Sequence, residues 1–166
     1  MRPIRALAAT AAVAFAAGCS TAADPTGMPA AAVAAPCVET VATPAAQRPA
    51  ALAGTTSNWY GEGDIWVAVP DYPPTRQGEA LVLKFPVVTL VDGAPTASRG
   101  APVITAVRVD AAGEAPGQVG GFAQAFGTSD LSFWPASVAL PAPGCWRITG
   151  LLAAQAVEFT VWVEEP

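Results

Sequence analysis

Hydrophobic and polar residues alternate most clearly at the end of the chain. From residue 157 to residue 163, Val, Phe, Val and Val alternate with Glu, Thr and Trp. Successive side chains of a β-strand point to opposite faces, so this period of two predicts a strand with one buried face. A second strand is predicted just before it, where Trp146 and Ile148 fall on one face and Arg147 and Thr149 on the other.

The same alternation recurs in short segments through the middle of the chain, with proline and glycine between them. Pro86 is expected to break a strand or mark a sheet edge, and Pro135 to interrupt one. Residues 44–54 and 111–121 are predicted to be loops, and the Asp-Gly pair at 92–93 a hairpin turn. About seven short strands with regular turns predict an all-β sandwich over residues 37–166. The further strands are expected at 37–41, 64–69, 81–85, 87–91, 103–109 and 131–140.

A set of residues in these strands forms a recognisable pattern. Trp66 lies in an early strand, Lys84 precedes an aromatic residue, Arg108 and Asp110 end a strand, and residues 143–150 read Pro-Gly-Cys-Trp-Arg-Ile-Thr-Gly. In these residues the chain resembles a family of uncharacterised bacterial lipoproteins with a C-terminal Pro-Gly-Cys-Trp signature. The resemblance covers most of the chain after residue 57. It implies a single immunoglobulin-like antiparallel β-sandwich on a lipid anchor, and it brings no known reaction.

The first 18 residues have the pattern of a secretory signal. Two arginines are followed by a short run of small apolar residues that ends in Ala-Gly before Cys19. This arrangement resembles a lipobox, so residues 1–18 are predicted to be a lipoprotein signal peptide and Cys19 to carry a diacylglyceryl group. The partner would be the lipid bilayer, and the location the extracytoplasmic side of the cell envelope. Ordinary cleavage near Ala16 or Ala23, giving a secreted protein, is the alternative.

Residues 19–36 connect this anchor to the domain. They are rich in Ala, Pro and Thr and almost without charge, which predicts a flexible tether that buries too little surface to fold. If Cys19 carries lipid, Cys37 and Cys145 remain, and an even pair in an oxidising compartment predicts a disulfide. Two free thiols are the alternative.

Charge and composition exclude several kinds of site. The chain has 166 residues and a net charge of −5, and without Arg2 and Arg5 of the leader it has 6 basic and 13 acidic residues, a net charge of −7. An acidic chain without a basic cluster argues against nucleic-acid binding. Because the chain has no His, neither a metal centre nor a cofactor is expected. Glycines at 117, 120 and 121 lack the Lys-Ser/Thr of a phosphate loop.

Two groups of side chains are candidates for chemistry. Trp59, Tyr60 and Trp66 form the densest aromatic group; a core role is expected, and an exposed group that stacks on a sugar or a partner is the alternative. Glu62 and Asp64 are two residues apart, which is a weak signal for acid–base catalysis or calcium binding and is typical of solvated charges. Ser129 and Ser132 have no His to activate them.

These features predict a membrane-anchored extracytoplasmic lipoprotein that binds a ligand or has a structural role, and no enzymatic activity. One alternative is a carboxylate-based hydrolase, or a glycan-binding domain that uses the aromatic group. Another is an immunoglobulin-like protease inhibitor. The partner would be a protein or a glycan.

Overall fold

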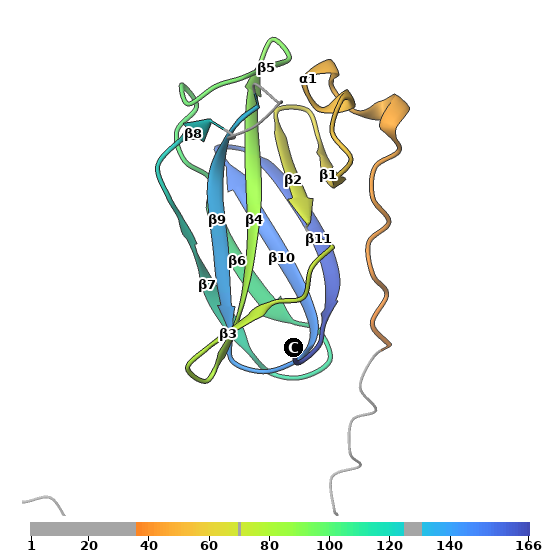
Figure 1. Ribbon diagram of the computed structural model, residues 1–166, viewed down its shortest axis with the longest axis vertical. Coiled ribbons are helices and arrows are strands. Elements are labelled where there is room, and N and C mark those ends of the chain that lie inside the picture. The colour runs from red at the N-terminus through yellow and green to blue at the C-terminus, as the bar shows by residue number, and fades with distance from the viewer. Residues whose placement is uncertain (1–35, 70, 125–130) are drawn as a thin grey trace, which may run out of the picture. The chain divides into compact units, whose positions relative to one another are not determined.

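The structure is a computed structural model that describes residues 36–69, 71–124 and 131–166 (Figure 1). The chain divides into two units at residues 32 and 33, and the described residues all belong to the second unit. The predicted signal peptide, the lipidation of Cys19, the tether up to residue 35 and Ser129 lie outside the described residues. They stay predictions.

Strands make up nearly all the regular structure of the described residues. Two short helical turns come first, η1 (Ala45–Gln47) and α1 (Ala50–Ala53). Eleven strands follow: β1 (Asn58–Glu62), β2 (Ile65–Val69), β3 (Thr75–Gln77), β4 (Ala80–Val91), β5 (Ala94–Pro95), β6 (Val103–Arg108), β7 (Glu114–Val119), β8 (Ala123–Gln124), β9 (Ser132–Leu140), β10 (Gly144–Leu152) and β11 (Gln155–Val163).

The strands form an antiparallel sandwich. Their order along the sheet is β1-β2-β4-β9-β7-β6-β10-β11, with β3 and β5 paired to β4 and β8 paired to β9. In Figure 1, β1, β2, β4 and β9 lie in front and β6, β10 and β11 behind. The strand β7 connects the layers, because residues 114–116 pair with β6 and residues 117–119 pair with β9. The predicted all-β antiparallel sandwich is confirmed, with more strands than the expected seven.

The main core lies between these layers. It takes alternate residues from each strand, for example Leu81, Leu83, Phe85 and Val87 from β4. Phe159 of β11 is fully buried among them and packs edge-on against Phe85, with ring centroids 5.8 Å apart. Burial of one such side chain contributes about 1.5–3 kcal/mol, so the alternation read from the sequence is also the main source of stability.

A second, smaller cluster covers part of the opposite face of the front layer. Val88 and Leu90 have the other parity in β4, so they point away from the main core. They pack with Trp59, Trp66 and Leu52, the last of which comes from α1. The segment 44–54, predicted to be a loop, therefore contains two helical turns that close one end of this face.

The N-terminal segment 37–43 follows the sheet edge without being a regular strand. Its Thr40 N–H donates to the Thr160 carbonyl of β11 (3.0 Å), and its Thr43 N–H donates to the Trp59 carbonyl of β1 (2.7 Å). The segment thus bonds to the two end strands of the sheet order, and Figure 1 shows it running beside them. The prediction of an edge strand at 37–41 is wrong in type and correct in position.

The prediction that the two prolines break or interrupt their strands is wrong, whereas the alternative of a sheet edge at Pro86 agrees with the pairing. Pro86 does not break its strand, because β4 runs through it, and Pro135 lies inside β9 directly opposite. Pairing of β2 with β4 ends at Val87, and pairing of β7 with β9 ends at Ala136. Each proline therefore lies just beyond the end of its outer neighbour, where its missing N–H removes no bond to that strand.

The predicted loop at 111–121 contains β7. Pro116 and Gly117 suggested a turn, but they lie where the strand passes from one layer to the other. A Cβ at residue 117 would lie 2.5 Å from the Cβ of Ile104, so glycine is needed for close approach of β6 and β7. The Asp-Gly hairpin turn is confirmed, with positive φ at Asp92 (51°) and Gly93 (77°) between β4 and β5.

Candidate functional site

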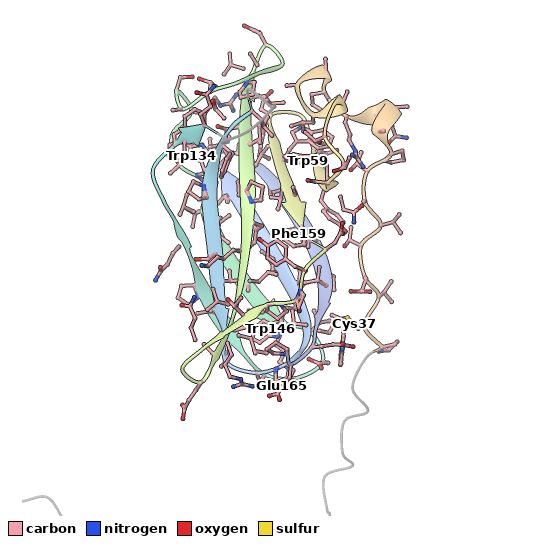
Figure 2. All side chains as sticks on the ribbon, viewed as in Figure 1. Cys37, Trp59, Trp134, Trp146, Phe159 and Glu165 are labelled. Carbon is pink, nitrogen blue, oxygen red and sulfur yellow. A yellow bond between two sulfur atoms is a disulfide. The ribbon has the colours of Figure 1, made fainter. Side chains whose placement is uncertain are left out.

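Two members of the predicted aromatic group are core residues. Trp59 is 1% exposed and Trp66 is 3% exposed, and both belong to the cluster under α1. The indole N–H of Trp59 donates to the Thr55 hydroxyl, and that of Trp66 donates to the Gly63 carbonyl at 3.0 Å. Figure 2 shows Trp59 at the α1 end of the domain. The alternative interpretation, in which Trp59, Tyr60 and Trp66 form one exposed stacking surface, is therefore wrong.

Tyr60, the third member, faces the other way. Trp59 and Tyr60 are neighbours in β1, so their side chains point to opposite faces. The ring of Tyr60 stacks on Phe159, with centroids 5.4 Å apart and planes 27° from parallel. Burial raises the pKa of the Tyr60 hydroxyl, and the charges of Glu39 and Asp71 raise it further. Tyr60 is half-buried and shares no surface with the two tryptophans.

The candidate carboxylates Glu62 and Asp64 have different surroundings. Asp64 Oδ2 accepts from Arg99 Nη1 at 2.6 Å and from Gln155 Nε2 at 3.4 Å. These contacts tie the start of β2 to the loop after β5 and to the start of β11. Glu62 is exposed at the end of β1. Asp64 therefore has a structural role.

The cysteine prediction is confirmed. Cys37 and Cys145 form a disulfide, with Cα atoms 5.5 Å apart. Cys145 is fully buried. Figure 2 shows Cys37 and Trp146 at the end of the domain opposite Trp59. The bond fastens the N-terminal segment to β10.

Four other residues of the pattern lie around this disulfide: Arg108, Asp110, Gly144 and Trp146. Arg108 Nε donates to Asp110 Oδ1 at 2.7 Å, and this hydrogen bond is the main cause that lowers the pKa of the Asp110 carboxyl. A hydrogen bond from the Cys145 backbone lowers that pKa as well. Gly144 has φ of 144°, and a Cβ there would lie 2.7 Å from an Arg108 guanidinium nitrogen. The buried Trp146 indole donates to the Ala142 carbonyl at 3.1 Å. These residues build a structural corner around the disulfide.

Two residues of the pattern lie away from this corner, Trp66 in the cluster under α1 and Lys84 on the outward face of β4. Lys84 has the outward parity of Val88 in β4 and is exposed. Among the described residues it forms no ion pair, since the four that occur all use arginine. Lys84 lies in the larger of two hollows on the domain surface.

The larger hollow, here called the outer groove, has a volume of about 930 Å³ and lies on the outward face of the front layer. Pro86, Pro135, Ser137 and Lys84 form its floor, because they have the outward parity in β4 and β9. The loop 54–57, Trp59 and Tyr72 border it on the side of β1. On the other side lie Gln118, Val119, Gly120, Leu131 and Phe133.

The groove exists because the outward face is only half covered. At one end the bulky cluster under α1 fills the face, whereas farther along β4 and β9 the outward residues are a lysine, two prolines and a serine. Tyr72 is 57% exposed at its border. Sequence reasoning missed Tyr72 as a site residue, since no periodicity marks it; its neighbours Pro73 and Pro74 indicated only the end of a strand.

A second hollow of about 490 Å³ lies on the other side of Tyr72. Of the described residues, aromatic side chains and carboxylates line it, and no Lys or Arg does. The lining consists of Tyr60, Tyr72, Trp162, Glu39, Asp71 and Glu164, together with Asn58, Val69, Pro73, Pro74, Leu83, Val161 and Val163. Trp162 is 48% exposed there, although it falls on the polar face of its strand. Alternation predicted its outward direction and not its role.

No three His, Cys, Asp or Glu side chains in ranges 36–69, 71–124 and 131–166 are placed to hold a metal ion together. Within those ranges, no helix is both long enough and apolar enough to cross a membrane.

The described residues thus form the outer groove, the second hollow, and a structural corner at the disulfide. The lipoprotein-family resemblance and the immunoglobulin-like topology that it implies stay predictions. Comparison of the chain with protein-family models, with curated proteins and with solved structures finds no match.

Proposed function

We propose that this protein is a membrane-anchored extracytoplasmic lipoprotein whose β-domain binds a ligand in the outer groove without transforming it. The observation that carries the proposal is the groove itself. It combines about 930 Å³ of open volume with an exposed aromatic ring, apolar proline surface and a few polar groups. Concave sites with mostly apolar walls and a small number of polar groups are typical of ligand binding.

The charge of the lining suggests the chemistry of the ligand. Among the residues that the structure describes, Lys84 is the only charged one that lines the groove, in a chain of net charge −5. The hydroxyl of Ser137 and the amide of Gln118 add hydrogen-bonding capacity. A ligand with an acidic group near Lys84 and a ring or hydrocarbon face against Tyr72 fits this lining best. An acidic oligosaccharide has both features.

A titration followed by NMR tests the groove. Trigalacturonate should shift the backbone amides of β4 and β9 around Lys84, and neutral maltotriose should shift them less. Lys84→Gln should weaken trigalacturonate binding by roughly tenfold, since a charge-assisted hydrogen bond contributes about 1.5–3 kcal/mol. Lys84→Arg should restore most of it. The matched control Arg147→Gln removes an exposed cation from β10 and should change nothing.

Equal binding of the acidic and neutral sugars, or equal weakening by the Lys84 and Arg147 variants, would contradict this assignment of the groove. Failure of both sugars to bind would remove saccharides as the ligand class.

The anchor needs a separate experiment. Cys19→Ala should either move the protein from the detergent phase to the aqueous phase or leave its leader unprocessed, because the diacylglyceryl group would have no attachment site. The neighbouring Ser20→Ala is the matched control and should stay in the detergent phase. Normal processing of Cys19→Ala with retention in the detergent phase would show that the anchor is assigned wrongly.

The second hollow favours one alternative, the carboxylate-based hydrolase. It brings Glu39, Asp71 and Glu164 to one cavity. However, Glu39 accepts from the Trp162 backbone N–H at 2.7 Å and Asp71 accepts from the Asn58 amide at 2.8 Å, so two of these carboxylates already have structural partners. Hydrolysis of aryl glycosides that disappears in Glu164→Gln would support the hydrolase over the binding domain.

A further inference from the structure

The second hollow has a lining that differs from that of the outer groove in both ring content and charge. Three aromatic rings border it, those of Tyr60, Tyr72 and Trp162. Trp162 and Tyr72 are 48% and 57% exposed, so their faces are accessible to a ligand, whereas Tyr60 is held in place by its stacking on Phe159. Exposed aromatic rings around a cavity provide apolar contact area and negative ring faces.

The charges around these rings all have one sign. Within the described part of the chain, Glu39, Asp71 and Glu164 line the hollow and no Lys or Arg does. The potential in the hollow is therefore negative, and it stabilises a cation. Arg76 is the basic residue nearest to Tyr72 in the sequence. It does not line the hollow, and it forms an ion pair with Glu165 at 2.7 Å.

The effect on Tyr60 is consistent with this sign. Glu39 and Asp71 both raise the pKa of the Tyr60 hydroxyl, after burial as the first cause. The two carboxylates therefore act on the aromatic ring that forms the inner wall of the hollow.

The kind of cation follows from the arrangement of the carboxylates. No three acidic side chains among the described residues are placed to hold one metal ion. Glu39 and Asp71 also accept hydrogen bonds from the protein at 2.7 and 2.8 Å, which orients them and occupies part of their capacity. A diffuse cation with an apolar surface needs no close ligand shell, and it gains from aromatic faces.

We propose that the second hollow binds the methylated ammonium group of a small organic cation. The methyl groups contact the faces of Trp162 and Tyr72, and Glu39, Asp71 and Glu164 supply the compensating charge without direct coordination. This site is distinct from the outer groove, since Lys84 lines only the groove and Trp162 lines only the hollow. Tyr72 lines both, so it is not a useful variant for telling the two sites apart.

The test is an NMR titration with choline, followed at the indole N–H groups. Four tryptophans donate their indole N–H within the protein: Trp59, Trp66, Trp134 and Trp146. The Trp162 indole resonance should shift on addition of choline while those four stay in place. Two control solutes accompany choline: 3,3-dimethylbutan-1-ol, its uncharged isostere, and sodium chloride at equal ionic strength.

Two variants measure the ring and charge contributions, with binding followed at the Asp71 backbone amide. Trp162→Leu should weaken choline binding roughly fivefold, as expected for loss of a partly exposed cation–π contact. Glu164→Gln should weaken it at least about twofold through the lost charge, a modest effect because the side chain is exposed. The matched control Glu114→Gln makes the same charge change on β7, outside the hollow, and should leave choline binding unchanged.

Several results would overturn the proposal. A shift of equal size with the uncharged isostere would mean that only apolar contact occurs. Equal weakening by Glu114→Gln and Glu164→Gln would mean that only the net charge matters. A choline response no larger than that of sodium chloride would remove the site. Because Glu164 is exposed near the C-terminus, its variant keeps the test valid even if Trp162→Leu does not fold.

The two sites can fail independently. Lys84→Gln should leave choline binding intact, and Glu164→Gln should leave trigalacturonate binding intact. Loss of both responses in either variant would indicate damage to the fold rather than to one site.

Discussion

Replacement of Cys37 by alanine tests how the domain is held together. The disulfide joins residues with a sequence separation of 108, so it closes almost the whole domain into one loop. In the chain-entropy model, a loop of this length lowers the entropy of the unfolded chain by an amount that stabilises the fold by about 5 kcal/mol. Since a domain of this size has a total stability of about 5–15 kcal/mol, the loss is a large fraction of it.

The observed loss should be smaller than the loop value, because the segment attached through Cys37 can separate on its own. Residues 37–43 bury little surface, and their contacts to β1 and β11 are mainly hydrogen bonds. The backbone N–H groups of Thr40 and Thr43 donate to these strands, and the side chains of Thr40 and Glu39 accept from β11. Each hydrogen bond contributes about 0.5–1.5 kcal/mol net, so without the disulfide this segment should fray before the core unfolds. We therefore expect the free energy of unfolding to fall by about 3–5 kcal/mol.

Urea denaturation and amide hydrogen exchange together check this expectation. Denaturation measures the global loss, and exchange should show protection lost first at the Thr40 and Thr43 amides while β9 and β10 stay protected. Cys37 is the residue to change, because Cys145 is fully buried and its replacement would also alter the core. The matched control Val38→Ala removes a side chain that is 77% exposed in the same segment and should change stability little.

The reasoning is refuted if Cys37→Ala loses less than about 1 kcal/mol, because the loop would then contribute almost nothing. It is refuted equally if β10 and β11 lose protection before residues 37–43, because the segment would then not be the weakest part.

Three more substitutions test the packing and the structural corner. Gly117→Ala places a Cβ 2.5 Å from the Ile104 Cβ and should lower the free energy of unfolding by about 1–3 kcal/mol in urea denaturation. Leu52→Ala leaves a cavity under α1 and should cost about 2–5 kcal/mol by the same measurement, with Trp59 fluorescence shifting to the red. Asp110→Asn should lower the melting temperature at neutral pH. The hydrogen bond from Arg108 lowers the pKa of the Asp110 carboxyl in the folded state. The ionised carboxylate therefore stabilises the fold fully above its ordinary pKa of 3.8, and this stabilisation is lost as the pH falls below that value. The difference in melting temperature between wild type and this variant should therefore shrink below about pH 3.8; a constant difference down to pH 2 would contradict the role of the charge.

The fold was largely predictable because its signals are local. The alternation at 157–163 corresponds to β11, and the pattern around Trp146 corresponds to β10. The strand β7 was not predictable, because Pro116 and Gly117 are turn residues in isolation and become strand residues only through their position between two layers. The short helix α1 is equally context-dependent, since its single buried residue is Leu52.

The candidate sites were less predictable, since they depend on which outward positions are left uncovered. The aromatic group at 59–66 was visible in the sequence, and the structure divides it between two faces. Tyr72 and Trp162 carried no distinguishing pattern, yet they are the exposed rings of the two hollows. Both rings line the second hollow because β11 lies near the segment after β2. Such a long-range arrangement cannot be predicted from local periodicity.

Except for Lys84, the signature residues lie apart from the candidate binding residues, and this separation limits what the signature can mean. Arg108 and Asp110 bond to each other, Gly144 gives the guanidinium room, and Cys145 holds the disulfide. All four are occupied by contacts within the domain, so a chain that shares them is expected to share this corner and its closure by the N-terminal segment. Ligand chemistry instead depends on outward side chains that the fold tolerates in many forms. Of the residues in the signature, only Lys84 reaches a hollow, and therefore proteins with the same signature should differ in ligand wherever the outward residues of β4, β9 and β11 differ.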